Sequence, residues 1–276
     1  MTKLFKLVLI ASAIVALTTG CKDNNGGDPI KKMIPSEIKY IYSNNNYSYS
    51  FTYCYSYDNR NRIIRIEEFY DNGTSYIQDF NYDAKGRLVG ISVDGDYGFT
   101  FSYVDNYVFI YLCGEEFAKF EVKNDRLIKV YELDEGEEEL ILTVSYDSRG
   151  NVTRIVNDYR GEMFVNYENK RGIYSGINMP SWFLVIDFAT EGDLWFHTVN
   201  NPLTIKDVYE NRTYLTTYLY EDYDNDYPTK IIVKEDEILS KQSKVFSFFN
   251  RKEKPTRSIS SDEYSSHYEI KYIEAK

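Results

Sequence analysis

Histidine is almost absent from this chain, which carries only His197 and His267 in 276 residues. The two histidines do not stand at the spacing of zinc ligands, and a Ser-His-Asp triad would have to use one of them. The run from Gly172 to Gly176 does not match the G-x-S-x-G nucleophile elbow, and no glycine-rich phosphate loop is present. These absences predict a protein that is not an enzyme and that needs no cofactor.

Proline and long helical periodicity are also scarce, and the long apolar run of the chain lies at its N-terminus. Lys3 and Lys6 precede an apolar stretch over residues 7–17, which is too short to cross a bilayer, because a spanning helix needs about 20 apolar residues. With small residues and Cys21 after it, this order resembles a bacterial lipoprotein signal, in which Cys21 becomes the diacylated mature N-terminus. Thr18 stands where that signal has leucine, and an ordinary cleaved signal is the alternative.

The residues after Cys21 are typical of a flexible tether, because residues 22–29 are polar and rich in glycine. Lys22 followed by Asp23 resembles the surface-export signal of Bacteroidota lipoproteins, which usually carries two acids. We expect a signal peptide at residues 1–20, a tether at 21–34 and a single domain at 35–276. The protein is then an outer-membrane lipoprotein of the cell envelope, exposed at the cell surface.

The chain is acidic, with a formal net charge of −11. Affinity for nucleic acid comes largely from lysine and arginine at phosphates, so we expect no nucleic-acid partner. Anionic lipid headgroups would repel the chain as well, so we expect membrane contact through the lipid anchor alone. Of the two remaining cysteines, Cys54 and Cys113, an exported chain permits a disulfide, but buried free thiols in strands are the favoured interpretation.

Tyrosine is abundant, with 28 residues, and it opens a repeated turn sequence. The pattern Tyr-Asp-x-x-Gly-Arg-Leu is nearly complete from Tyr57, Tyr82 and Tyr146, and shorter or degenerate copies begin at Tyr103, Val122, Tyr167 and Tyr223. Aspartate caps such a turn through its side chain, and the glycine position suits a positive φ, which Asn61 tolerates in the first copy. From 57 to 167 the copies recur every 19 to 25 residues, which predicts a hairpin as the repeat unit.

The strands between these turns alternate clearly. Residues 47–57 place tyrosine and phenylalanine on one face and small polar residues on the other, and the C-terminal segment repeats the theme. About eighteen to twenty antiparallel strands are expected, and so many strands curl, split or close. Charges on both strand faces argue against a transmembrane barrel. Residues 178–202 interrupt the pattern with an apolar run at 181–188, either a short helix or a buried strand, and Asn201-Pro202 predicts a turn.

The lipoprotein signal, the Tyr-Asp repeats, Asn178-Met179-Pro180 and the late sequence from Tyr223 to Lys230 together resemble a Bacteroidota lipoprotein family of unknown function. The repeats are similar to YD repeats, which build sheets hairpin by hairpin. The resemblance implies a porin-like fold and carries no assigned activity. We therefore expect an all-β domain of consecutive hairpins, curled into a soluble half-barrel or a porin-like barrel.

Two groups of residues are candidates for binding. Asp222, Asp224 and Asp226 have the spacing that begins a calcium loop, but the glycine and glutamate that should follow are missing, so an acidic hairpin turn is favoured over a metal site. Trp182 and Trp195 flank the irregular segment, where their rings could stack on a sugar at a barrel mouth, although aromatic faces of this kind also form cores.

The favoured function is that of a non-catalytic, lipid-anchored envelope protein that binds a glycan or a protein partner. One alternative is a carrier that encloses an apolar ligand inside the curled sheet, which requires a cavity. Another is a glycosidase that uses a pair of carboxylates, because such pairs have no sequence signature.

Overall fold

The computed structural model describes residues 31–44, 47–95, 97–134, 136–158, 161–185, 198–209, 212–239 and 264–276. Cys21 and Trp195, to which the sequence assigns lipidation and ligand binding, lie outside these residues, as do the signal peptide and most of the tether. Met33 and Ile34, which the sequence places in the tether, belong to the first strand.

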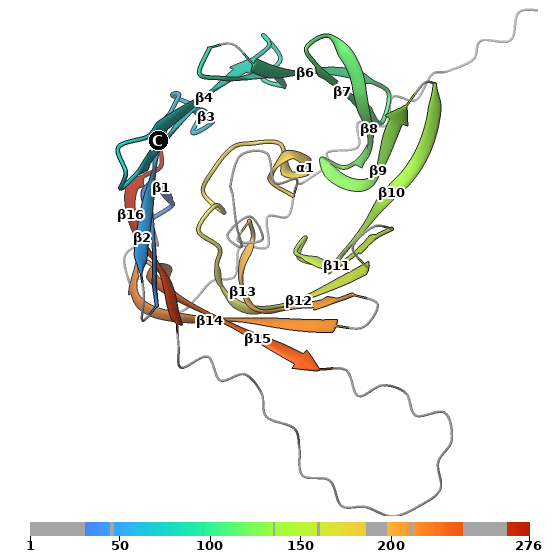
Figure 1. Ribbon diagram of the computed structural model, residues 1–276. Helices are drawn as coiled ribbons and strands as arrows, with labels where there is room; N and C mark the ends of the chain where they lie inside the picture. The colour runs from blue at the N-terminus through green and yellow to red at the C-terminus, as the bar shows by residue number, and fades with distance from the viewer. Residues whose placement is uncertain are drawn as a thin grey trace, which may run out of the picture. The chain divides into compact units, whose positions relative to one another are not determined.

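The described residues form sixteen antiparallel strands and one short helix (Figure 1). The strands are β1 (Met33–Asn44), β2 (Ser48–Tyr57), β3 (Ile63–Tyr70), β4 (Ser75–Tyr82), β5 (Leu88–Val93), β6 (Tyr97–Val104), β7 (Tyr107–Leu112), β8 (Glu115–Lys123), β9 (Arg126–Asp134), β10 (Glu137–Tyr146), β11 (Val152–Asn157), β12 (Gly161–Arg171), β13 (Asn200–Val208), β14 (Arg212–Asp224), β15 (Tyr227–Leu239) and β16 (Tyr264–Glu274), and the helix is α1 (Ser181–Leu184).

Each strand pairs with its neighbours in sequence, and β1 pairs with β16, so the sheet closes into a barrel. The closing pair is long, because its register runs from Met33 opposite Glu274 to Asn44 opposite Tyr264. Of the two predicted forms, the structure shows the barrel. The described strands are fewer than the eighteen to twenty expected, partly because β14 and β15 are thirteen residues each.

The strand alternation sorts side chains between the lumen and the outer surface. The tyrosine stripe of β2 faces inward, and Tyr53 and Tyr55 are buried in the core. Charged residues on the other face form ion pairs between neighbouring strands, such as Arg65 with Asp79 at 2.7 Å. The period-two pattern therefore gives this barrel an aromatic interior and a charged exterior.

Residues 172–185 leave the sheet after β12 and enter the lumen, where α1 lies inside the ring of strands (Figure 1). We call these residues the plug. Trp182 packs edge-on against Phe101 and Phe120, and Phe183 packs against Phe80. Because most of this segment is buried, its sequence lacks the alternation of a strand. Of the two predicted forms, the structure shows a short helix at 181–184.

A tyrosine hydroxyl closes the same end of six of the eight hairpins, donating to a carbonyl of the partner strand. The pairs are Tyr57 with Pro35, Tyr82 with Ile63, Tyr103 with Leu88, Tyr146 with Leu127, Tyr220 with Pro202 and Tyr272 with Pro228. Three of these rings also carry an arginine over one face; Arg62, for example, lies 4.2 Å from the centroid of Tyr82. In four copies of the repeat, the opening tyrosine therefore ties the open end of its hairpin together; these are Tyr57, Tyr82, Tyr103 and Tyr146.

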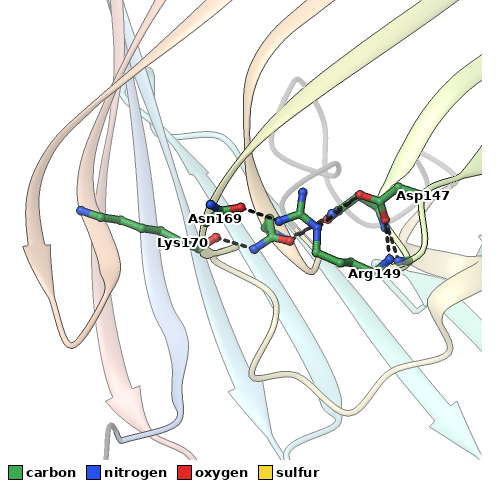
Figure 2. Close-up of polar contacts among 7 residues, drawn as sticks. Asp147, Arg149, Asn169 and Lys170 are labelled. Carbon is green, nitrogen blue, oxygen red and sulfur yellow. Dashed lines mark hydrogen bonds and ion pairs between the residues drawn. The ribbon is translucent and has the colours of Figure 1, made fainter. Parts of the chain in front are cut away.

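The predicted turn geometry is confirmed. Asp83 accepts hydrogen bonds from the backbone N–H and from Nε of Arg87, at 2.9 and 2.8 Å. Asn61 has a φ of 59° and Gly150 a φ of 101°, so both occupy the left-handed position that the pattern requires. In the third copy, Asp147 caps its turn in the same way (Figure 2).

Two local expectations are wrong. Asn201 and Pro202 lie within β13, where Pro202 sits opposite Tyr167 at an irregularity in the register. An irregular pairing tolerates a residue without an N–H, which explains how proline fits there.

Cys54 lies in β2 as expected, but Cys113 is exposed in the turn between β7 and β8, with a φ of 54°. Both cysteines are free, and only Cys54 is partly buried.

Candidate ligand-binding cavity

A cavity of about 340 Å³ opens in the lumen between β8 and β13. Its wall is mainly apolar and reaches from buried core positions to residues near the turns that join β7 to β8, β11 to β12 and β13 to β14. The apolar lining consists of Phe117, Ala118, Phe120, Leu127, Val130, Ile141, Leu142, Ile155, Met163 and Val185. We call this space the apolar cavity.

The plug forms the inner end of the apolar cavity through Val185, the residue that directly follows α1. The other end is marked by Phe117 and Tyr209, which are 43% and 39% exposed. The cavity therefore runs from the buried plug to the surface. A volume of this size lies within the range of small-molecule sites, which are concave and mostly apolar.

Asp207 of β13 introduces a carboxylate into this wall. Partial burial, with a smaller contribution from the negative charge of Glu235, raises the pKa of Asp207 to about 6. Register places Asp207 opposite Met163 of β12 and Tyr214 of β14. Within the described part of the chain, the side-chain carboxylate of Asp207 makes no hydrogen bond or ion pair. An ionised carboxylate in such surroundings is unfavourable, so the group holds its proton into weakly acidic solution.

The other charged residues of the lining are also acidic. Glu162 pairs with Arg154 at 2.8 Å, whereas Glu132 lies on the luminal wall with Asn157 nearby in the lining. The described residues that line the apolar cavity include neither lysine nor arginine. The cavity can therefore take an apolar body and place a polar group beside Asp207.

The structure places Trp182, a predicted ligand platform, in the core. Its side chain is 2% exposed and is surrounded by aromatic rings of the barrel wall. A sugar needs an open ring face for stacking, so the burial of Trp182 argues against that role. The assignment of Trp195 stays a prediction.

Asp222, Asp224 and Asp226 lie at the hairpin turn between β14 and β15. Positive φ angles, between 49° and 68°, occur here at Asp222, Asn225 and Asp226. In the residues that the structure describes, no three histidine, cysteine, aspartate or glutamate side chains gather in a way that could hold a metal ion. The arrangement is that of the acidic hairpin turn.

Sequence reasoning raised a cavity only as a requirement of the carrier alternative, and it neither located the apolar cavity nor singled out Asp207. Asp207 stands in the ordinary alternating pattern of a strand, in the run Lys206-Asp207-Val208, so its type and spacing carry no signal. The lining comes from six consecutive strands and the plug, and only the closed barrel brings them together.

No known protein family and no curated protein matches the sequence. Among solved structures, the chain is similar to a porin-like protein from Bacteroides uniformis, with 10% identity and a TM-score of 0.36 over 87% of this chain and 98% of the other. A porin-like protein from Bacteroides vulgatus gives 11% identity and a TM-score of 0.37 over 87% and 99%. A TcdB2-TccC3-TEV structure gives 16% identity and a TM-score of 0.21 over 67% of this chain and 9% of the other.

Proposed function

We propose that this protein is a non-catalytic carrier or sequestering protein of the bacterial cell envelope, which holds a small apolar ligand in the apolar cavity. The observation that carries the proposal is the mainly apolar cavity of about 340 Å³ between the plug and the surface. The hydrophobic effect supplies the affinity, at about 25 cal/mol per Å² of apolar surface removed from water.

The apolar cavity favours this carrier over the glycan-binding function suggested by the sequence. Sugar sites use exposed aromatic faces and many polar contacts, whereas Trp182 is buried and the polar groups of this cavity are few. A glycosidase would use Asp207 and Glu235 as its carboxylates, and the raised pKa of Asp207 suits a general acid. The apolar lining supports the non-catalytic function instead.

The location is proposed from the N-terminal sequence. Cys21 is the lipidated residue of an outer-membrane lipoprotein, and the residues between Cys21 and the start of β1 tether the barrel to the membrane, with the barrel on the cell surface. The barrel itself is proposed to be soluble, because ion pairs such as Lys230–Glu221 and Lys271–Glu37 lie on its outer face, where a lipid-facing band would be apolar. Among the residues described, no helix has the length and apolar character to cross a membrane.

Binding is tested with an environment-sensitive naphthalene-sulfonate dye and with saturated and unsaturated fatty alcohols as competitors. The variant Ala118→Phe adds a ring to a residue that lines the cavity and is 4% exposed. The control Val165→Phe adds bulk to an equally buried luminal position outside the cavity. Overpacking costs about 1–3 kcal/mol of stability at either position, so thermal unfolding is measured for both.

The proposal expects saturable, one-to-one dye binding to the wild type, displacement by the alcohols and loss of binding in Ala118→Phe alone. Absence of saturable binding in the wild type would overturn it. Equal binding by Ala118→Phe and the wild type would overturn the assignment to this cavity. Release of reducing sugar from envelope or host glycans, lost in Asp207→Asn, would replace the carrier with the glycosidase.

A further inference from the structure

A second cavity, of about 540 Å³, lies at the opposite end of the barrel. It is formed by the turns that join β2 to β3, β4 to β5, β6 to β7 and β8 to β9, together with plug residues 178–180 and Trp182. Its lining combines charged and polar side chains with apolar ones, unlike that of the apolar cavity. We call it the turn-end cavity.

Two guanidinium groups of the first turn converge on the glycine of the second turn. A methyl group at position 86 would lie 3.3 Å from Nη1 of Arg62 and 3.7 Å from Nη1 of Arg60. Gly86 therefore leaves the space that both side chains use. Two like charges repel each other at such a position, unless an anion lies between them or beside them.

Arg62 is held in place from its other side. Its Nε donates to Oδ2 of Asp58 at 2.7 Å, and its guanidinium lies over the ring of Tyr82. Nη1 of Arg62 is buried and has no hydrogen-bond partner. A buried donor without an acceptor is costly, by about 1–3 kcal/mol, and it marks a place where an acceptor is missing.

Lys85 and Arg87 flank Gly86 and line the same cavity. Arg87 pairs with Asp83 of its own turn, as Arg62 does with Asp58. Arg60 and Lys85 have no ion-pair partner in the described part of the chain. Two positive charges therefore remain uncompensated on this wall, in a chain whose net charge is −11.

The opposite wall carries hydrogen-bond acceptors. Asp105 and Asp125 line it, together with the amides of Asn106 and Asn124. Asp125 already accepts the backbone N–H of Ser181 of the plug at 2.8 Å through one of its oxygens. A ligand that reaches this wall must offer donors such as hydroxyl groups, since a second anionic group would meet two carboxylates.

We propose that the turn-end cavity binds an acidic carbohydrate, with the oxyanionic group of the sugar at Arg60, Arg62 and Lys85 and its hydroxyl groups at Asp105 and Asp125. Arg62 supplies the fixed donor, and Arg60 and Lys85 supply charge from the two exposed turn tips. Charge-assisted hydrogen bonds to a carboxylate or a sulfate are the strong contacts of the site. The site is separate from the apolar cavity and does not rest on the carrier function.

The test is calorimetric titration of the full-length mature protein with glucuronate, glucose 6-sulfate and glucose at low ionic strength. The double variant Arg60→Gln/Lys85→Gln removes two exposed charges and leaves the Asp58–Arg62 turn intact. The matched control Lys123→Gln/Arg149→Gln removes the same charge from two residues at the same barrel end that do not themselves line the cavity. Thermal unfolding of both variants checks that the barrel is unchanged.

The proposal expects saturable binding of glucuronate or glucose 6-sulfate, at least tenfold weaker binding in the Arg60/Lys85 variant and unchanged binding in the control. The better of the two acidic sugars identifies carboxylate or sulfate as the oxyanion. Binding of glucose with equal affinity would overturn the role of the oxyanion. Equally weakened binding in the control variant would show that only the net charge of the protein matters, and it would overturn the roles of Arg60 and Lys85. No binding of either acidic sugar would overturn the site.

Discussion

The tyrosine hydroxyls at the ends of the hairpins offer a sharp test of how the repeat stabilises the barrel. Tyr103 donates to the carbonyl of Leu88 at 2.6 Å, and its ring lies under the guanidinium of Arg87. Tyr103→Phe removes the hydroxyl and keeps the ring, so the packing and the cation–π contact remain. The loss is then that of one hydrogen bond, about 0.5–1.5 kcal/mol.

Tyr167 is the matched control. It opens a later copy of the repeat, but its hydroxyl is buried without a hydrogen-bond partner. Tyr167→Phe removes a buried polar group that makes no hydrogen bond, so we expect unchanged or slightly raised stability. Both variants lose the tyrosine hydroxyl, and they differ in whether that hydroxyl makes a hydrogen bond.

The measurement is the free energy of unfolding of each variant in urea, followed by tyrosine and tryptophan fluorescence and by circular dichroism. Coincident transitions by both probes and equal slopes with denaturant establish that the comparison is valid. The reasoning predicts that Tyr103→Phe is less stable than Tyr167→Phe by about 1 kcal/mol. Equal stabilities, or the reverse order, would refute the view that these hydroxyls tie the hairpins together.

Three further outcomes follow from the structure. Trp182→Ala should lower the free energy of unfolding by about 3–5 kcal/mol, because the ring is 2% exposed inside the barrel, and urea unfolding measures it. Hydrogen bonds from the backbone and side chain of Arg87 lower the pKa of Asp83. The ionised carboxylate of Asp83 therefore stabilises the fold above the ordinary aspartate pKa, and this stabilisation is lost as the pH falls through the lower folded-state pKa. Asp83→Asn should flatten the fall in melting temperature below about pH 4. The pH dependence from Asp207 has the opposite direction, because its folded-state pKa is raised to about 6. The stability that its protonated form provides is present at low pH and is lost as the pH rises from about 4 to 6. Asp207→Asn should remove that loss of stability in the same melting series.

The repeat and the strand alternation predict the hairpins well, because both depend on residues that are close in sequence. Tyr82, Asp83, Gly86 and Arg87 form one turn from six consecutive positions, and the capping bonds are local. Closure of the barrel depends on pairing between β1 and β16, at the two ends of the domain. An open sheet has the same alternation as a closed one, so the pattern could not decide between them.

The sites depend on contacts of still longer range. Tryptophan occurs both in protein cores and in sugar-binding platforms, and only the position of the plug inside the barrel shows that Trp182 belongs to the core. Asp207 has no distinguishing spacing, and its raised pKa comes from the lumen that surrounds it. Sequence predicts such residues poorly, because burial in a barrel is a property of all the strands together.

The neighbours of each turn explain why, among the described residues, the proposed oxyanion site forms beside Gly86 and not beside Gly150. In the third turn, Nη1 of Arg149 donates to Asn169 at 2.7 Å, so the residue equivalent to Arg60 and Lys85 is already bonded (Figure 2). The space at Gly150 is taken by Arg126, whose Nη2 would lie 2.6 Å from an added methyl group. At Gly86, two arginines meet, and among the described residues Nη1 of Arg62 has no hydrogen-bond partner and Arg60 has no ion-pair partner. The same turn sequence therefore has its cationic side chain hydrogen-bonded within the barrel at one place and unpaired at another, and the neighbouring strands decide which.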